Sequence, residues 1–282
     1  MIKSSTCHSE LARAASRAQA RGFTLLEMAI VIFIIGMLSA GLLGPVQVQL
    51  EARDRHKTID TMAQAAEALY GYALTHRRLP CPATNANGLP DPSFTTASGG
   101  ACTQESGFLP WAELGVEPGD AWGNLLTYRV REKQFTWPAQ NTTCDGNGSA
   151  PEFDLCSQGN ISINTRGDNA ATSGAGNVES KFKFPAATSD NVTAVLVSHG
   201  RNGYGATGVD GTARAPVPSA NADEAENADG DAVFVSRGYS QAQDGCADNE
   251  NETSPLCEFD DLVLPISRTL LNSRMVSAGQ LP

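Results

Sequence analysis

The sequence predicts an α+β protein in which one long N-terminal helix packs on an antiparallel β-sheet with long, disulfide-stapled loops. Three observations support this fold class. An apolar run followed by an amphipathic pattern extends to residue 79, short β-branched runs alternate with loop-forming segments after residue 80, and six cysteines are spread over that second part. Aromatic residues make up only 6% of the 282 residues, which argues against a helical bundle.

The charge of the chain is unevenly distributed. The formal net charge is −11, but residues 1–22 contain four basic residues against Glu10, so the rest of the chain carries −14. A surface this acidic repels the phosphates of nucleic acids and the head groups of anionic lipids. We therefore expect no nucleic-acid binding by the part of the chain after residue 22.

An uncharged, strongly apolar segment covers residues 28–50. As a helix, a segment of this length spans roughly 30 Å, the thickness of a hydrocarbon layer. Basic residues precede it and acidic residues dominate after it, which favours a cytoplasmic N-terminus. The sequence thus predicts a single transmembrane helix at residues 23–50, with residues 1–22 on the cytoplasmic side and a globular domain at residues 80–282 outside the cytoplasm.

Glu27 lies at the start of this apolar segment. A carboxylate there costs roughly 2.5–3.5 kcal/mol on insertion scales, so it needs a partner in the membrane. A cut between Gly22 and Phe23 creates an α-amino group four residues from Glu27, and the amine of one subunit can neutralise the carboxylate of its neighbour. The buried charge then becomes an assembly determinant.

Two other interpretations of the apolar segment remain open. Residues 38–40, Leu-Ser-Ala, match the cleavage site of an ordinary secretory signal, and the segment also fits a single-span anchor without processing. Glu27 and the helical pattern that follows argue against the secretory signal. Sequencing of the mature N-terminus distinguishes the three cases.

Residues 51–79 continue the helix as an amphipathic segment that ends at Leu79-Pro80-Cys81-Pro82. Its apolar residues recur at three- and four-residue steps. These stripe residues are Ile59, Met62, Ala63, Ala66, Leu69, Tyr70, Ala73 and Leu74. We expect the stripe to pack against a sheet.

Short β-branched or aromatic runs bounded by turn residues predict strands at residues 125–130, 192–198, 231–236 and 262–266. No second strong helical pattern lies between them, so we expect mostly antiparallel pairing. Residues 139–180 and 211–231 are rich in small polar residues or acids and are expected to form long insertions or surface loops.

Six cysteines remain if Cys7 is removed with the leader: Cys81, Cys102, Cys144, Cys156, Cys246 and Cys257. Six cysteines in a loop-rich, extracytoplasmic chain favour disulfides, for which fifteen connectivities exist. Pairing of sequence neighbours closes the shortest loops, and each such bond stabilises the fold by about 3 kcal/mol. A zinc site is the competing interpretation, but Cys-x-x-Cys and a nearby histidine cluster are absent from the sequence.

Acidic residues concentrate near the C-terminus. Residues 221–261 contain twelve Asp or Glu against one basic residue, Arg237. Oxygen ligands at this density suit calcium, although a solvated, self-repelling loop surface has the same composition.

The hexapeptide of residues 22–27, Gly-Phe-Thr-Leu-Leu-Glu, together with the apolar run, resembles the prepilin cleavage and methylation signal of type IV pilins and type II secretion pseudopilins. The resemblance implies that a prepilin peptidase cuts after Gly22 and methylates Phe23. It also implies that Glu27 directs assembly with other pilin or pseudopilin subunits on an inner-membrane assembly platform. The leader of 22 residues is longer than most in the family.

Two further segments resemble the major pseudopilin. Residues 120–128, with Asp-Ala-Trp-Gly-Asn and a later Tyr, resemble its Asp-Pro-Trp-Gly-Asn…Tyr segment, and residues 198–203 with Asp261-Leu262 resemble its Ser-x-Gly-x-Asp-Gly turn and closing Asp-Ile. The resemblance implies a structural calcium ion near Ser198, Asn202 and Asp261, with Asp260 as a spare carboxylate. In this chain Asn202 replaces an Asp of the family, and Pro265 stands where the family usually has Trp.

The sequence contains little that indicates a catalytic site. His56, His76 and His199 lie in no nucleophile or metalloprotease motif. We therefore predict a non-enzymatic, pilin-like minor subunit of a type II secretion pseudopilus. The alternative is a minor pilin or tip adhesin of a type IV pilus, to which the long disulfide-rich loops are suited.

Overall fold

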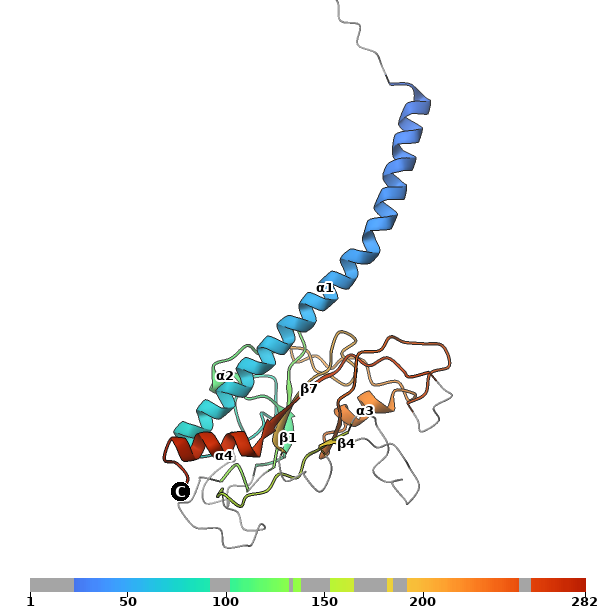
Figure 1. Cartoon of the computed structure of the whole chain (residues 1–282). Coiled ribbons are helices and arrows are strands. Elements are labelled where there is room, and N and C mark those ends of the chain that lie inside the picture. Colours follow the sequence, from blue (N-terminus) through green and yellow to red (C-terminus); the bar gives the residue numbers. More distant parts are fainter. Residues whose placement is uncertain are drawn as a thin grey trace, which may run out of the picture. The chain divides into compact units, whose positions relative to one another are not determined.

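The computed structural model describes residues 23–91, 102–131, 134–137, 153–164, 182–184, 192–248 and 255–282, except for the side chains of residues 40–47 and 182–184. The chain divides into an N-terminal unit, Met1–Leu50, and a C-terminal unit, Glu51–Pro282. Helix α1, Leu25–His76, contributes its first half to the N-terminal unit and its second half to the C-terminal unit (Figure 1). The predicted leader, residues 1–22, lies outside the described residues.

The N-terminal unit exposes its apolar side chains. Every described side chain of residues 23–39 is exposed, including Leu25 at 88% and Phe33 at 70%. Within the residues that were described in full, none of the helices combines the length and the apolar content required to cross a membrane. The predicted transmembrane segment includes residues 40–47, whose side chains lie outside that set.

The second half of α1 packs on a four-stranded antiparallel sheet. Its strands are β1 (Ser106–Phe108), β2 (Thr127–Val130), β5 (Val192–Ser198) and β7 (Leu262–Ser267), in the order β1-β2-β5-β7. Leu69 and Ala73 of the helix share one buried core with Tyr128 and Leu196 of the sheet. The predicted α+β class, a long helix on an antiparallel sheet, is confirmed.

The buried face of α1 differs in part from the predicted stripe. Met62, Ala66, Leu69, Tyr70 and Ala73 are buried, but Ile59 is 45% exposed and Ala63 is exposed as well. Two threonines occupy the core side instead. The hydroxyls of Thr58 and Thr61 donate to the carbonyl oxygens one turn earlier, at 3.0 Å each, so their burial leaves no unpaired polar atom.

A second, three-stranded sheet lies on the other side of β5. It consists of β4 (Phe182–Phe184), β3 (Ser162–Asn164) and β6 (Val233–Val235), in the order β4-β3-β6, and β3 pairs with β6 in parallel. Val195 and Val197 of β5 pack with Ile163 and Phe234 in a second core, while Ala194 and Leu196 face the α1 core. Because side chains alternate along a strand, β5 is buried on both faces.

Three short helices were not predicted: α2 (Trp111–Leu114), α3 (Ala222–Ala228) and α4 (Arg268–Ser277). Helix α3 lies within residues 211–231 and strand β3 within residues 139–180, both of which the sequence pattern assigned to loops. Both elements are stabilised by contacts to distant residues, which local periodicity does not report. Helix α4 follows edge strand β7 directly and places Leu271 and Met275 in the α1 core.

Two disulfides, Cys81–Cys102 and Cys246–Cys257, join sequence neighbours as the shortest-loop pairing predicts. Cys156 is also disulfide-bonded, and its predicted partner, Cys144, lies outside the described residues, as does Cys7.

Candidate functional site

The start of α1 is organised by Thr24. Its hydroxyl oxygen accepts a hydrogen bond from the backbone N–H of Glu27 at 3.1 Å, and its carbonyl oxygen accepts one from the N–H of Met28 at 3.1 Å. Thr24 therefore caps the helix, and the Thr-x-x-Glu spacing is that of a capping box. Sequence reasoning missed this cap, although the spacing was readable.

The side chains of Phe23 and Glu27 are both exposed in the isolated chain, Phe23 at 77%. Gly22, the residue before the expected cut, lies outside the described residues. A free amine on Phe23 would stand directly before the capped helix, and a carboxylate in the first turn of a helix is stabilised by the helix dipole.

The second candidate is a cluster of buried carboxylates, here called the acidic centre: Glu224, Asp260 and Asp261. One oxygen of each lies within 4.8 Å of the others, a geometry that can hold a metal ion. Glu224 comes from α3, and the two aspartates directly precede β7. Their exposed fractions are 0% for Glu224 and 3% for each aspartate, so water does not compensate their charge.

Glu224 is fully hydrogen-bonded. Its Oε1 accepts from the side-chain amide of Asn202 at 3.0 Å and from the backbone N–H of Asp260 at 3.1 Å. Its Oε2 accepts from the side-chain amide of Asn221 at 2.7 Å and from Asn202 at 3.2 Å. These bonds fix the carboxylate of α3 against the segment that carries the two aspartates.

The two aspartates are only half satisfied. Oδ2 of Asp260 accepts from the backbone N–H of Asn202 at 2.9 Å, and Oδ2 of Asp261 accepts from the side-chain amide of Asn227 at 2.8 Å. The buried Oδ1 atoms of both aspartates have no hydrogen-bond partner among the described residues. Such buried acceptors are costly unless a cation or a proton satisfies them.

Within the described residues no arginine or lysine forms an ion pair with the acidic centre, although the more distant charges of Arg201 and Arg237 act to lower the pKa of Asp260 and of Asp261, respectively. Only His199 comes within ion-pair distance, with Nδ1 at 3.8 Å from Oδ2 of Asp261. Burial lowers the pKa of His199 to about 4, so its imidazole is neutral. Burial also raises the pKa of Glu224 to about 7 and that of Asp260 to about 6, and it raises the pKa of Asp261. The site therefore favours protons or a cation.

The donor set fits a hard cation. The atoms grouped closely enough to hold an ion are carboxylate oxygens, and the buried Nδ1 of His199, which also lacks a hydrogen-bond partner among the described residues, lies 3.8 Å from Oδ2 of Asp261. Oxygen-only sites of this kind suit calcium or magnesium better than zinc. A cation held by the three carboxylates would compensate their charge and hold α3 to the segment before β7.

The absence of a side chain at Gly200 leaves the space that the carboxylate of Asp260 occupies. Gly200 has a φ of +59°, and a Cβ built on it would lie 2.0 Å from Oδ1 of Asp260. A side chain at this position would displace the orphaned oxygen. Glycine is therefore required both by the backbone conformation and by the close approach.

The structure brings three of the four predicted ligands together. Asn202, Asp260 and Asp261 meet, whereas Ser198 is turned toward another carboxylate: its hydroxyl donates to Oδ2 of Asp120 at 2.7 Å. Glu224 was missed because its helix was expected to be a loop. The Asn-x-x-Glu spacing of residues 221–224 is a helix-start signal that could have located it.

The two segments that resemble the major pseudopilin also lie in contact. Besides the bond from Ser198 to Asp120, the side-chain amide of Asn124 donates to the carbonyl oxygen of Gly200 at 3.1 Å. Oδ1 of Asp120 in turn accepts from the backbone N–H groups of Trp122 and Asn124, each at 2.9 Å. Residues 120–124 and 198–200 thus form one hydrogen-bonded unit beside the acidic centre.

Comparison with known families agrees with the N-terminal assignment. The family described as the prokaryotic N-terminal methylation motif matches residues 17–43. No curated protein and no solved structure matches the chain. The chain thus carries a prepilin-type cleavage and methylation signal, typical of type IV pilins and pseudopilins, whose members are in general structural proteins processed by prepilin peptidase and assembled with pilin subunits.

Proposed function

We propose that this pilin-like chain is a minor structural subunit of a type II secretion pseudopilus. In this proposal a prepilin peptidase cuts after Gly22 on the cytoplasmic side of the inner membrane and methylates Phe23, and the subunit then enters a filament. The observation that carries the proposal is the methylation motif together with the first half of α1, in which every described side chain up to residue 50 is exposed.

The exposed half of α1 requires a covering environment. Leu25, Leu26 and Phe33 are each at least 70% exposed, and burying apolar surface is worth roughly 25 cal/mol per Å². Lipid provides this cover before assembly, and the equivalent helices of neighbouring subunits provide it in the filament. The aqueous phase on either side of the membrane cannot cover these apolar side chains.

Glu27 supports assembly rather than simple anchoring. Its backbone N–H is used by the Thr24 cap, while its carboxylate is exposed at the first turn of the helix. In the proposed filament this carboxylate pairs with the α-amino group of Phe23 from a neighbouring subunit. Because the pair is neutral overall, it lowers the cost of a charge in an apolar environment.

The secretion pseudopilus is favoured over the type IV pilus by the contact between residues 120–124 and 198–200. These segments resemble separate parts of the major pseudopilin, and the hydrogen bond from Ser198 to Asp120 joins them across 78 residues of sequence. The adjoining acidic centre is proposed to bind a structural calcium ion through Glu224, Asp260 and Asp261, with Asn202 holding Glu224 in place.

A minor pilin or tip adhesin of a type IV pilus is the alternative. The second sheet favours it, because β3 and α3 arise from long segments between the strands of the main sheet and enlarge the C-terminal unit. An enlarged surface of this kind suits a binding role at a filament tip.

The test is deletion of the gene followed by complementation. We expect loss of type II cargo from the culture medium with surface pili retained, restoration by the wild type, and a mature N-terminus at methylated Phe23 by mass spectrometry. Glu27→Leu and Glu27→Gln should be cleaved but not restore secretion, whereas Glu113→Gln, a change at an exposed glutamate of α2, should restore it.

Three outcomes would contradict the proposal. Loss of pili with normal secretion would favour the type IV alternative. An intact Met1, or an N-terminus at Ala40 or Gly41, would remove the filament role. Unchanged secretion by Glu27→Leu would show that charge pairing does not determine assembly. Quantitative mass spectrometry of isolated filaments gives the copy number, expected to be low for a minor subunit.

A further inference from the structure

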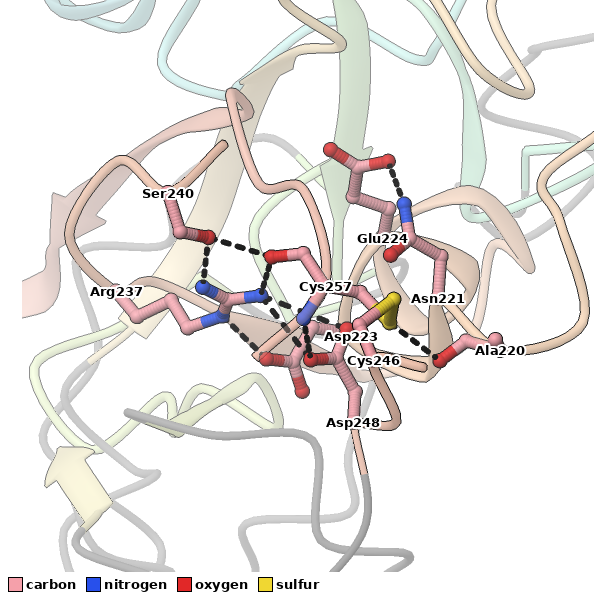
Figure 2. Close-up of a disulfide and its surroundings, with 9 residues drawn as sticks. All are labelled: Ala220, Asn221, Asp223, Glu224, Arg237, Ser240, Cys246, Asp248 and Cys257. Carbon is pink, nitrogen blue, oxygen red and sulfur yellow. Dashed lines mark hydrogen bonds and ion pairs between the residues drawn. A yellow bond between two sulfur atoms is a disulfide. The ribbon is translucent and has the colours of Figure 1, made fainter. Parts of the chain in front are cut away.

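The disulfide Cys246–Cys257 lies beside the start of α3, where Figure 2 shows Cys257 next to Ala220. Helix α3 bears Glu224, and the segment that follows Cys257 leads to Asp260 and Asp261. The contacts of this bond to each segment can be followed atom by atom.

The first set of contacts holds the start of α3. Sγ of Cys257 lies 3.3 Å from the carbonyl oxygen of Ala220, and the same oxygen accepts a hydrogen bond from the backbone N–H of Asp248 at 3.2 Å. Ala220 directly precedes Asn221, whose side-chain amide donates to Glu224 at 2.7 Å. The loop closed by the disulfide therefore fixes the residue from which α3, and with it Glu224, begins.

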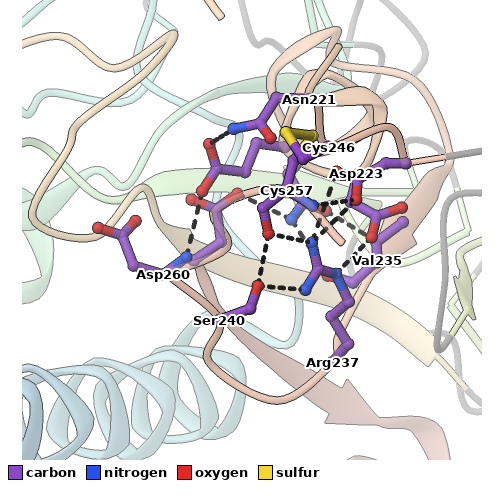
Figure 3. Close-up of polar contacts among 12 residues, drawn as sticks. Asn221, Asp223, Val235, Arg237, Ser240, Cys246, Cys257 and Asp260 are labelled. Atoms are coloured by element: carbon purple, nitrogen blue, oxygen red, sulfur yellow. Dashed lines mark hydrogen bonds and ion pairs between the residues drawn. A yellow bond between two sulfur atoms is a disulfide. The ribbon is translucent and has the colours of Figure 1, made fainter. Parts of the chain in front are cut away.

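The second set of contacts holds the segment before Asp260 (Figure 3). The carbonyl oxygen of Cys257 accepts from Arg237 at 3.2 Å and from the hydroxyl of Ser240 at 2.6 Å, and its N–H donates to Asp248 at 2.9 Å. Two residues further on, Phe259 pairs with Ser240 through two backbone bonds, and the guanidinium of Arg237 lies over its ring. Asp260 follows immediately.

Arg237 completes this arrangement by neutralising the acids on both sides of the bond. It forms ion pairs with Asp223 of α3 and with Asp248 of the disulfide loop. The side chains of all three residues are buried. The disulfide, Arg237 and Asp248 thus form one connected support under the acidic centre.

We propose that the Cys246–Cys257 disulfide makes cation binding by the acidic centre conditional on oxidation. The inference rests on the cation site proposed above. With the bond formed, α3 and the segment before β7 are held at the spacing that brings three carboxylates together. With the bond reduced, the chain between the two cysteines gains freedom, and the carboxylates repel one another without a fixed frame.

The covalent step is an ordinary thiol–disulfide exchange. The two thiols of Cys246 and Cys257 form one S–S bond and are oxidised, and a disulfide-donor protein or oxidised glutathione accepts the two electrons and two protons and becomes two thiols. A reducing cytoplasm keeps the thiols, and an oxidising compartment supplies the donor. The chain then becomes able to bind the cation only after its C-terminal unit has left the cytoplasm.

Thermodynamic linkage makes the inference testable in both directions. If the disulfide raises cation affinity by some factor, the cation must raise the stability of the disulfide against reduction by the same factor. The Cys81–Cys102 disulfide is the matched control, because its described contacts include no residue of the acidic centre, of α3 or of the segment before β7.

The experiment uses the full processed chain in detergent, with calcium as the probe. Oxidised wild type and Cys81→Ser/Cys102→Ser are expected to bind calcium by calorimetry with affinities within about twofold of each other. Cys246→Ser/Cys257→Ser is expected to bind at least about tenfold more weakly, a typical size for coupling between sites. Far-UV circular dichroism checks that each variant is folded.

A second measurement avoids the cysteine variants altogether. Wild type is equilibrated in a glutathione redox series with calcium or with a chelator, alkylated, and analysed by mass spectrometry. Calcium should make the Cys246–Cys257 disulfide harder to reduce, which shifts its reduction midpoint to a more reducing glutathione mixture. The midpoint of Cys81–Cys102 should stay unchanged. This arm decides the inference if Cys246→Ser/Cys257→Ser does not fold.

The outcomes separate the inference from the cation site on which it rests. If oxidised wild type binds no calcium, the cation site and the inference both fail. If wild type and Cys246→Ser/Cys257→Ser bind calcium equally well, or calcium leaves both reduction midpoints unchanged while it binds, only the redox inference fails.

Discussion

The side-chain amide of Asn202 donates to both carboxylate oxygens of Glu224, at 3.0 and 3.2 Å. At this position the segment of the major pseudopilin that residues 198–203 resemble has an Asp, whereas this chain places an uncharged amide against Glu224. The two bonds help to fix the Glu224 carboxylate without a metal, whereas Oδ1 of Asp260 and Oδ1 of Asp261 have no hydrogen-bond partner among the described residues.

Asn202→Asp should therefore lower the stability of the metal-free protein and raise its affinity for calcium. Without metal, the change removes two hydrogen bonds to a charged group and adds a like charge, so we expect a loss of about 2–3 kcal/mol in the free energy of unfolding. With calcium, the added carboxylate should strengthen binding. Thermal melts in chelator and in calcium measure both effects. Asn202→Ser is the control that loses the bonds without adding charge, and equal calcium affinity in Asn202→Asp and wild type would contradict the prediction.

Gly200→Ala should abolish the response to calcium. The new Cβ would lie 2.0 Å from Oδ1 of Asp260 and must displace it. Gly123→Ala is a matched control, because Gly123 also has a positive φ, +80°, but nothing lies within 4 Å of its added Cβ. Both variants should lose about 1 kcal/mol to backbone strain, and Gly200→Ala should lose more because its Cβ would also lie 2.7 Å from the backbone oxygen of Asp260. Calorimetry should show calcium binding only by Gly123→Ala, and binding by Gly200→Ala at wild-type affinity would count against the site.

The metal-free protein should lose stability as pH rises from 6.5 to 8. Burial raises the pKa of Glu224 to about 7 and that of Asp260 to about 6 in the folded chain, so folding favours their protonated forms. Their contribution is complete below the unfolded pKa values and is lost as pH rises through the folded ones. Burial raises the pKa of Glu226 to about 7 as well, which acts in the same sense. Chemical denaturation in chelator measures the slope.

Two checks accompany this pH profile. Burial lowers the pKa of His199 to about 4, so His199 adds stability as pH rises through its unfolded pKa of 6.5, and this opposite effect fades in the upper part of the chosen window. Glu224→Gln should reduce the slope and leave the part that comes from Glu226. Excess calcium should do the same, because the cation compensates the ionised carboxylates. A rising stability between pH 6.5 and 8 in chelator would overturn this prediction.

Arg237→Ala should be strongly destabilising. The change leaves the buried carboxylates of Asp223 and Asp248 without their partner, which costs about 3–5 kcal/mol. Arg201→Ala is the control, since the exposed pair of Arg201 with Glu51 is worth about 1 kcal/mol or less. Urea denaturation compares the two variants. Similar losses in both would show that the buried pairs do not support the fold.

The sequence was most informative where local pattern and burial coincide. Strand β5 was predicted with its exact ends because seven buried residues between turn residues leave a clear signal. Helix α1 was predicted too, but its buried face differs in part from the predicted stripe. Thr58 and Thr61 can be buried because their hydroxyls donate to carbonyl oxygens of their own helix, and a hydrophobicity pattern does not register such bonds.

Elements held by distant contacts were missed. Helix α3 has seven residues, and its side chains are held by partners from elsewhere: Asn202 and Asp260 bond Glu224, and Asn227 bonds Asp261 and Val235. Without these partners the segment is an acidic loop by composition. Glu224 was missed for this reason, whereas Asp260 and Asp261 were identified through resemblance rather than periodicity.

Strand β7 forms one edge of the main sheet, and its partner on the inner side is β5, with Pro265 opposite Val195. Proline has no backbone N–H and cannot extend a ladder of hydrogen bonds to a further strand. Molecules of this chain brought to high local concentration are thus discouraged from fusing sheet to sheet, a common route to aggregation. Pro265 therefore makes the addition of a further strand at the β7 edge of the sheet less favourable.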